Sequence, residues 1–592
     1  MIRKSTYQKI LYIFNYIGYK KLLFILFLVL IGATLEVIGI SSIGPFIAIL
    51  INPNLIQENH ILNLLYQNSP NYIKGNFINY FGFSLIIIFV IVNIFIAYLT
   101  YTIEKVSRQS TANLSIALLS KYISNSYTFI VEKNSNELVK NVIIEVQQVI
   151  HGILLPILQS VGKFFITLFI CIFLFFINFK ITAYLIIFLS IIFSLVFIFA
   201  KSKLRKLGIQ RSLIDKFRFI VSNEAIGAIK EAKILNIENF FISKFSTASF
   251  NYAKVHVKVL VYTIFPKYFI ELLIMITIIC SLLLVSNNSN LISNLPILSI
   301  YIFAGYRILP GMHVLYASFS SVKKSEESLN IIYKDLFQNE KKYKSEISNE
   351  KIEFNHSIKL EKVCFNYQNK KNNIINNLSL KINKFDKIAL FGQTGVGKST
   401  FIDLITGLID PKSGSILIDH LILNNKNKSS WFKQISYIPQ SIFFTDASFS
   451  ENIAIGEQEK NINYTKIEES MNIANINFVN PKSREELSKN IGEYGKNLSG
   501  GEKQRIGIAR SIYSNRNILI FDEATNAIDN ITEEKIISQL IKMKKTIFFI
   551  THNSRYLKNF DKVIFFDQYQ KVYIDTYENL LNNEEFKNLQ KN

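Results

Sequence analysis

Cysteine is scarce in this chain of 592 residues, which holds only Cys171, Cys280 and Cys364. The three are scattered and odd in number, so they support neither a disulfide framework nor a metal site. Internal repeats and low-complexity tracts are also missing from the sequence.

Acidic residues are few, with 44 Asp and Glu against 66 Lys and Arg and a formal net charge of +22. Such an excess is typical of proteins that bind nucleic acid or an anionic membrane surface. No Lys/Arg block is interleaved with aromatic residues, and no nucleic-acid motif occurs. We therefore interpret the charge as membrane-related and expect no nucleic-acid partner.

Apolar residues are abundant, at 49% of the chain with a mean hydropathy of +0.24, and the excess precedes about residue 320. Apolar runs long enough to cross a bilayer predict six α-helical transmembrane spans. They lie at 22–51, 83–103, 154–177, 181–200, 264–285 and 295–319. The first run lacks a small-residue cleavage site and predicts a retained helix rather than a signal peptide.

Basic residues predict the orientation of these spans. They gather in residues 1–21, in 104–153 and directly after residue 200, whereas 52–82 carries the single cation Lys74. By the positive-inside tendency both termini are cytoplasmic, and 104–153 and 207–256 are cytoplasmic helical extensions. Domain boundaries follow from the composition: a membrane domain at 1–320, a charge-dense linker at 321–350 and a soluble domain at 351–592. We expect the linker to be a helix end followed by a surface segment.

A glycine-rich stretch at 392–400 organises the soluble domain. Its residues are Gly392, Gln393, Thr394, Gly395, Val396, Gly397, Lys398, Ser399 and Thr400. It joins a predicted strand to a predicted helix, so backbone N–H groups and the helix dipole converge where polyphosphate fits. Lys398 can reach the β- and γ-phosphates and Ser399 can ligate Mg²⁺. The strand and helix on either side argue against a chance match of a short pattern.

A second motif ends the apolar run 518–521 with Asp522 and Glu523. Four apolar residues indicate a buried parallel strand, whose end places both carboxylates at the sheet edge. There Asp522 can hold Mg²⁺ and Glu523 can deprotonate the attacking water. From residue 351 short β-rich runs alternate with helical ones, which predicts an α/β domain with a small antiparallel β part.

The run Leu498 to Arg505 contains Ser499, Gly500, Gly501 and Glu502 and does not occur in most P-loop proteins. With it, the soluble half resembles the ABC ATPase family. That resemblance implies further roles: Tyr367 stacks on adenine, Gln440 senses γ-phosphate and Mg²⁺, Asp529 lies in the dimer-contact loop, and His552 contacts γ-phosphate. It also implies that the Ser499 loop completes the ATP site of a partner subunit.

Three positions depart from the family pattern. Glu502 stands where glutamine is usual, Asn526 stands where serine is usual, and residues 492–495 differ from the family's Glu-Arg-Gly loop. None of these changes removes a phosphate ligand, a Mg²⁺ ligand or the base, so we expect active ATP hydrolysis.

Six spans followed by one nucleotide-binding domain resemble an ABC exporter half-transporter. The resemblance implies a homodimer with two composite ATP sites that use ATP and Mg²⁺. It also implies coupling helices near 126–137 and 215–235 that rest on the ATPase domains. We expect a multi-pass protein of the bacterial inner membrane with its ATPase domain in the cytoplasm.

Intramembrane charges predict the substrate site. Arg307, within 303–310, has a setting that resembles the sixth span of bacterial lipid-linked-oligosaccharide flippases. Its guanidinium would suit a pyrophosphate by bidentate bonding, assisted by Lys267 and Lys163.

Other roles are open for these cations. Arg307 can instead pair with Glu36 or Glu271, and Lys267 and Lys163 can reach the inner interface along their apolar stems.

We therefore predict an ATP-driven flippase for a pyrophosphate-linked lipid oligosaccharide, as used in protein glycosylation. The alternative is a multidrug or lipid exporter in which Arg307 is structural. A third class, an ATP-gated membrane regulator without cargo, is disfavoured by the intact Glu523 and His552.

Overall fold

The computed structural model describes residues 5–51, 53, 56, 60–68, 70, 76–286, 291–337, 351–367, 373–569 and 571–591. The chain divides into two compact units. One comprises residues 1–125 and 129–343, and the other comprises 126–128 and 344–592.

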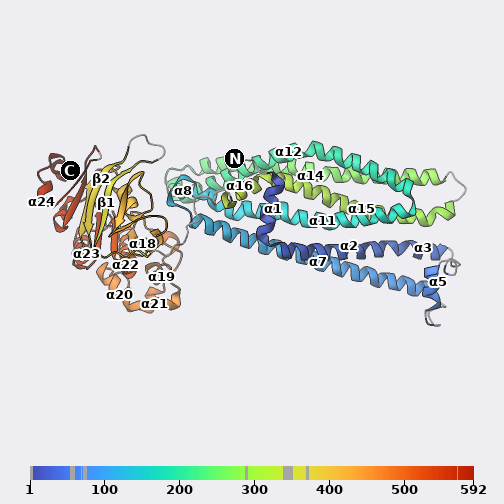
Figure 1. Cartoon of the computed structure of the whole chain (residues 1–592), viewed down its shortest axis with the longest axis horizontal. Coiled ribbons are helices and arrows are strands. Elements are labelled where there is room, and N and C mark those ends of the chain that lie inside the picture. The colour runs from blue at the N-terminus through green and yellow to red at the C-terminus, as the bar shows by residue number, and fades with distance from the viewer. Residues whose placement is uncertain are drawn as a thin grey trace. The chain divides into compact units, whose positions relative to one another are not determined.

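Although Tyr127 and Thr128 of α8 belong to the second unit, the first unit is built from helices of 4 to 49 residues. They are α1 (Thr6–Ile17), α2 (Tyr19–Ser41), α3 (Ile43–Ile51), α5 (His60–Gln67), α7 (Phe77–Ile123), α8 (Tyr127–Glu132), α9 (Ser135–Lys140), α10 (Val146–Val149), α11 (Leu155–Ile177), α12 (Phe179–Gly227), α13 (Ile229–Ile234), α14 (Glu238–Ser286), α15 (Leu291–Lys324) and α16 (Glu326–Phe337). Figure 1 shows α11, α12, α14 and α15 running alongside one another, and α2 beside α7.

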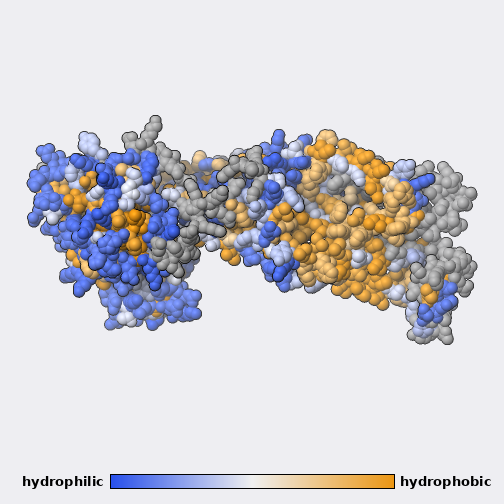
Figure 2. Space-filling view, in the orientation of Figure 1, coloured by the Kyte–Doolittle hydropathy of each residue, from blue (hydrophilic) through white to orange (hydrophobic). Residues whose placement is uncertain are grey.

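Three helical stretches within the described residues are long and apolar enough to cross a membrane: Tyr19–Gly39, Phe77–Ile123 and Ser135–Ile177. Helices α12, α14 and α15 lie where the fourth, fifth and sixth spans are predicted, and the count of six stays a prediction. Figure 2 shows hydrophobic residues gathered on the surface of the helical unit, and Phe176 of α11 is 87% exposed. An apolar surface of this extent suits contact with lipid rather than water.

The predicted first span, 22–51, is two helices rather than one. Helix α2 ends at Ser41, a turn residue follows, and α3 begins at Ile43. Pro45 has no N–H to donate to the carbonyl four residues earlier, and the Ser42 hydroxyl donates to the Gly39 carbonyl at 2.8 Å. The break therefore follows from local chemistry around Pro45.

The predicted linker, 321–350, is helical over most of its described part. Helix α15 runs to Lys324 and α16 follows, with Leu329 and Ile332 fully buried, so this stretch is not a surface segment. Charged groups of α16 find partners far away in the sequence: Asp335 accepts from Tyr122 and from Lys133, the latter at 3.1 Å. Residues 338–350 lie outside the described residues.

The second unit holds two sheets (Figure 1). Its strands are β1 (Ser357–Phe365), β2 (Ile375–Asn383), β3 (Lys387–Gly392), β4 (Ser413–Ile418), β5 (Leu421–Ile422), β6 (Ile435–Ile438), β7 (Ile518–Asp522), β8 (Thr546–Ile550), β9 (Lys562–Phe566) and β10 (Val572–Asp575). Its helices are α17 (Lys398–Thr406), α18 (Lys428–Phe432), α19 (Phe449–Ile453), α20 (Tyr464–Ile473), α21 (Arg484–Leu487), α22 (Gly500–Tyr513), α23 (Asn530–Lys542), α24 (Tyr577–Leu580) and α25 (Glu584–Lys591).

The smaller sheet is antiparallel, in the order β2-β1-β4-β5. The larger sheet has the order β10-β9-β3-β8-β7-β6, and all its pairings are parallel except β10 with β9. This arrangement confirms the predicted α/β domain with a small antiparallel β part.

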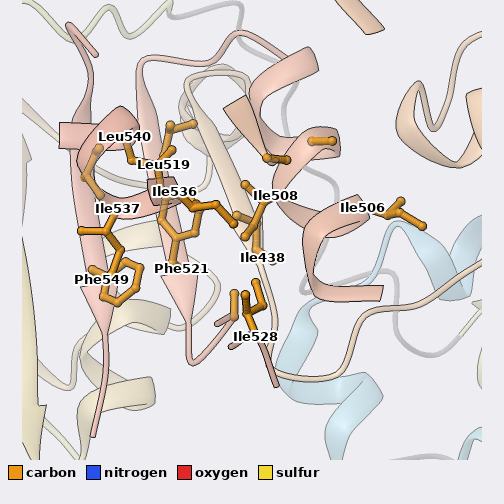
Figure 3. Packing of buried hydrophobic residues seen from close by; sticks show 14 of the residues in the cluster. Ile438, Ile506, Ile508, Leu519, Phe521, Ile528, Ile536, Ile537, Leu540 and Phe549 are labelled. Atoms are coloured by element: carbon orange, nitrogen blue, oxygen red, sulfur yellow. The ribbon is translucent and has the colours of Figure 1, made fainter. Parts of the chain in front are cut away.

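Apolar side chains cover both faces of the larger sheet and hold strand β7, which leads into Asp522 and Glu523, in place. Leu519 and Phe521 of β7 pack in one apolar cluster with Ile536 of α23 (Figure 3). Ile518 and Ile520 alternate with them and pack in the cluster on the other face. Burial on both faces is typical of a parallel strand and holds its C-terminal end rigidly.

Candidate active site

The strand order brings four chain segments to one edge of the larger sheet. Strands β3, β8, β7 and β6 are consecutive neighbours and parallel, so their C-terminal ends meet. The glycine-rich loop follows β3, His552 follows β8, Asp522 and Glu523 end β7, and Gln440 follows β6. Ligands of open α/β sheets bind at this edge.

The glycine-rich loop adopts backbone conformations with positive φ, which residues other than glycine rarely take. Gly392, Gly395 and Gly397 have φ of 151°, 85° and 115°. A Cβ on Gly392 would lie 2.5 Å from the Phe566 carbonyl oxygen. Gly397 directly precedes α17, so the N-terminal N–H groups of that helix stay open to an anion.

Lys398 is buried, with only 6% of its surface exposed, and it folds back over the loop. Its Nζ donates to the carbonyl oxygens of Gly392 at 2.6 Å and Gln393 at 2.9 Å, and it lies 3.5 Å from His552 Nε2. Burial lowers the pKa of Lys398 to about 8, and the Glu523 and Asp522 carboxylates oppose that shift. The lysine is thus held in the loop at the point where phosphate oxygens would replace the two carbonyls.

ATP affinity is expected to weaken as pH rises above about 8, because Lys398 then loses its proton in the free protein. Phosphate stabilises the ammonium and raises its pKa in the complex, so binding takes up a proton between the two pKa values. In that window Kd should rise by up to about tenfold per pH unit. Calorimetric titration of ATP at pH 7.5, 8.5 and 9.5 measures this slope.

The control for this slope is Lys398→Arg, whose guanidinium stays charged throughout. It should bind ATP less tightly and with a flatter pH dependence. An equal slope in both proteins would contradict the assignment to Lys398.

Glu523 lies at the centre of the site. Its Oε1 lies 2.8 Å from His552 Nε2, and its Oε2 accepts from Gln440 Nε2 at 2.9 Å and from Asn526 Nδ2 at 3.1 Å. The backbone of Glu523 has φ of 51°, a left-handed conformation that costs a residue with a side chain about 1 kcal/mol. Strain of this kind gathers at functional sites, where the surrounding structure maintains it.

Asp522 is the second carboxylate of the site and accepts from the Tyr437 hydroxyl at 2.8 Å. Burial raises its pKa, and the Tyr437 bond opposes that change. The neighbouring Asp403 has its pKa raised to about 6, first by burial and then by the Asp522 charge. The site therefore concentrates negative charge close to the loop that would hold phosphate.

The predicted Mg²⁺ ligands Ser399, Gln440 and Asp522 supply only oxygen donors of the kind Mg²⁺ prefers. No group of three or more His, Cys, Asp or Glu side chains able to hold a metal occurs among the described residues. The donor set therefore fits an ion that shares its coordination with phosphate and water, rather than one caged by protein alone.

Tyr367, the predicted adenine-stacking residue, lies near this cluster. Tyr367 lies with its hydroxyl 3.4 Å from the Thr400 hydroxyl and is 40% exposed, with its ring edge-on to Phe365. It is thus beside the glycine-rich loop and open to a stacking partner.

Ser499, Glu502 and Asp529 have local roles within this chain. Ser499 precedes α22 and forms a capping box with Glu502, whose Oε2 accepts from the Ser499 hydroxyl at 2.8 Å. Asp529 caps α23 by accepting from the Thr532 N–H at 3.0 Å. Gly500 and Gly501 pack on Ala527, and a Cβ on Gly501 would lie 2.8 Å from its carbonyl oxygen. Within the described part of the chain, these contacts do not connect Ser499 or Asp529 to Lys398.

The predicted substrate residues are in the first unit. Lys163 Nζ lies 3.8 Å from Glu36 Oε1, and Glu36 is 3% exposed. Both line a cavity of about 270 Å³ together with Gly32, Thr100 and Gln159. Lys267 is exposed on α14, with its Nζ 5.6 Å from the centre of the Tyr268 ring. Arg307 is part of α15, and its side chain lies outside the described residues, as does its predicted pairing with Glu36 or Glu271.

Sequence reasoning assigned no role to three residues that the structure places around the acidic pair. Tyr437 donates to Asp522, Asn526 donates to Glu523, and Gln504 accepts from the Ala527 N–H at 2.8 Å. The available signal was position: Tyr437 lies in β6, one residue before its end, and Asn526 departs from the family pattern three residues after Glu523.

Two protein families match parts of the chain. The family described as ABC transporter transmembrane region matches residues 22–304, and the family described as ABC transporter matches residues 375–526. The first match runs from within α2 to within α15, and the second covers the glycine-rich loop, the Ser499 motif and the acidic pair.

The pediocin PA-1 transport/processing ATP-binding protein PedD of Pediococcus acidilactici is 34% identical over 36% of this chain and 29% of its own length. The heterocyst differentiation ATP-binding protein HepA of Nostoc sp. is 29% identical over 61% of this chain and 59% of its own length. The chain thus spans less than two thirds of the length of these relatives.

A solved structure of a bacterial Atm1-family ABC exporter with ATP bound matches 97% of this chain and 98% of its own, with a TM-score of 0.76 and 18% identity. At that identity the likeness shows the fold.

Proposed function

Because the chain is an ABC half-transporter, with an ABC transporter transmembrane region followed by an ABC ATPase domain, we propose that it hydrolyses ATP to drive export across a membrane. The observation that carries this proposal is the convergence of Lys398, Glu523 and His552 at the edge of the larger sheet. A triphosphate needs a cation such as Lys398, and the attacking water needs a base such as Glu523.

Different residues bind the phosphates and activate the attacking water. The glycine-rich loop and Lys398 bind the β- and γ-phosphates, and Glu523 orients the water. Water oxygen bonds to the γ-phosphorus, the bond to the β,γ-bridging oxygen breaks, and one water proton passes to Glu523, giving ADP and phosphate. Bound Mg²⁺, held by Ser399, Asp522 and Gln440, would neutralise charge on the phosphate oxygens. His552, 2.8 Å from Glu523, is placed to contact the γ-phosphate.

We also propose that two copies of the chain form a homodimer. Among the described contacts none joins Ser499 or Asp529 to Lys398, which suits a role in the site of a second copy. ATP held between two such domains would favour one access state of the membrane halves, and hydrolysis would reset them. We place the protein in the bacterial inner membrane, with the ATPase domain and both termini cytoplasmic.

For the substrate, we propose a pyrophosphate-linked lipid oligosaccharide. Arg307 lies about eleven residues from the outer end of the predicted sixth span, roughly 16 Å at helical rise and so near the middle of the membrane. An intramembrane arginine is a functional candidate, and its fork of donors matches pyrophosphate. Lys267, exposed on α14, is a second cation for the same anion.

Replacing Arg307 by alanine is expected to stop flipping of a fluorescent polyprenyl-pyrophosphate saccharide in ATP-loaded proteoliposomes. Hydrolysis without lipid should continue, because Arg307 is remote in sequence from every motif of the ATPase domain. Arg307→Lys is the matched control, since it keeps the charge and loses the bidentate fork, and it should retain part of the activity. Unimpaired flipping by Arg307→Ala would show that this residue is not the anion ligand.

A second candidate is an exporter of a lipid or drug without net charge, and the Glu36–Lys163 pair favours it. The Lys163 ammonium at 3.8 Å from a buried carboxylate is already neutralised, so this cavity attracts a pyrophosphate weakly. An ATPase-active wild type that moves a dye or phospholipid and no polyprenyl pyrophosphate would establish this alternative.

A further inference from the structure

The Glu523 carboxylate has an unequal environment on its two oxygens. Oε2 accepts from two amide nitrogens, Gln440 Nε2 at 2.9 Å and Asn526 Nδ2 at 3.1 Å. Oε1 has only His552 Nε2, at 2.8 Å, among the groups that the structure describes around it. Since a carboxylate oxygen offers about two lone-pair sites, Oε2 is filled and Oε1 has one site open.

The loop that carries Asn526 is fixed from three sides. Gln504, which is 7% exposed, accepts from the Ala527 N–H at 2.8 Å and donates to the Glu523 carbonyl at 3.5 Å. Thr525 donates to the buried Glu533 at 2.6 Å. Gly501 approaches Ala527 so closely that a Cβ would lie 2.8 Å from its carbonyl oxygen. The Asn526 amide is therefore projected toward Glu523 from a rigid support rather than from a free loop.

We propose that Asn526 is a positioning residue for ATP hydrolysis: its amide, together with that of Gln440, holds Oε2 of Glu523 so that Oε1 receives the proton of the attacking water. The proposal rests on ATP hydrolysis as the proposed function and deepens it. One proton moves from water to Oε1 as the water oxygen bonds to the γ-phosphorus, and ADP leaves with the bridging oxygen. Asn526 itself touches neither water nor phosphate in this role.

Two substitutions separate positioning from simple space filling. Asn526→Asp keeps the shape of the side chain and replaces its donor by a second carboxylate beside Oε2. Asn526→Ala removes the donor without adding charge. If the amide positions Glu523, kcat should fall by about tenfold to a hundredfold in the alanine variant and further in the aspartate variant. If Asn526 only fills space, the alanine variant should keep the wild-type kcat, and only the aspartate variant, whose added carboxylate repels Glu523, should be slower.

Steady-state ATPase assays on the purified full chain measure kcat and KM for both variants. We expect KM for ATP to stay within about twofold, because the phosphate-binding loop is unchanged. Asn472→Asp, on the exposed side of α20, adds the same charge in the same unit and should match the wild type. Thermal unfolding followed by the fluorescence of Trp431, the only tryptophan, checks that the variants are folded.

The outcomes are distinct. A wild type that hydrolyses ATP, with kcat in the order wild type, alanine, aspartate, supports the proposal. A wild type that hydrolyses ATP with the alanine variant at the wild-type kcat, or with the change in KM rather than kcat, overturns the role of Asn526 alone. A folded wild type that does not hydrolyse ATP overturns the proposed function, and the role of Asn526 with it.

Discussion

Glu523→Gln is expected to lower the rate of ATP hydrolysis by about a thousandfold or more while ATP still binds. Glutamine keeps the size of the side chain and an oxygen acceptor, so the contacts with Gln440 and Asn526 can persist. It cannot accept the water proton at neutral pH. The binding groups, Lys398 and the glycine-rich loop, do not depend on the carboxylate for their backbone path. Turnover should therefore be lost at the chemical step and ATP should accumulate on the protein.

Glutamine is a sharper test than glycine or alanine at this position. The φ of 51° at Glu523 favours glycine, so a glycine variant would relax the backbone as well as remove the base. Phosphate release and binding of a fluorescent ATP analogue measure the two quantities separately. Glu534→Gln, at an exposed position of α23, makes the same change of charge and should leave hydrolysis unchanged. Near-normal hydrolysis by Glu523→Gln would remove Glu523 from the role of base.

The sequence predicted the parts of the site that depend on strand ends. A glycine-rich turn after one strand and two acids after another must lie at one edge if both strands are parallel, and β3, β8 and β7 show that they are. The spacing of Lys398 and Asp522 from their strands was enough to place them. No knowledge of side-chain packing was needed for this step.

The individual side-chain partners could not be predicted in the same way. Tyr437 meets Asp522 only because β6 is the neighbour of β7, although 85 residues separate them in the chain. Asn526 meets Glu523 within one turn, and Gln504 of α22 bonds to the backbone of that turn at Glu523 and Ala527. Such contacts depend on sheet order and rotamers, which local patterns do not encode.

The partners of charged side chains in the first unit could not be predicted from the sequence either. Glu36 and Lys163 lie on α2 and α11, and nothing in the local sequence of either helix indicates that they pair. The charges of α16 suggested a surface segment, yet Glu326 accepts from Thr6 at the start of the chain and Asp335 is 4% exposed. Composition alone cannot distinguish a solvated charge from a buried charge whose partner is distant in the sequence.

Lys398→Met is expected to abolish measurable ATP binding, weakening it by about a hundredfold or more, and to abolish hydrolysis with it. Methionine preserves most of the apolar stem of this buried side chain and removes the ammonium. In the ligand-free protein that ammonium donates to the Gly392 and Gln393 carbonyls, so the variant also leaves two acceptors without their donor. Loss of binding can therefore come from missing charge or from a disturbed loop.

A series of nucleotides distinguishes these two causes, because Lys398 reaches the β- and γ-phosphates and not the base. If charge dominates, photolabelling with azido analogues should show the largest loss for the triphosphate, a smaller loss for the diphosphate and little change for the monophosphate. A disturbed loop would weaken all three alike. Lys412→Met removes an exposed charge from the same unit and should bind every nucleotide as the wild type does. ATP binding by Lys398→Met at wild-type affinity would mean that backbone N–H groups and the dipole of α17 alone hold the phosphates.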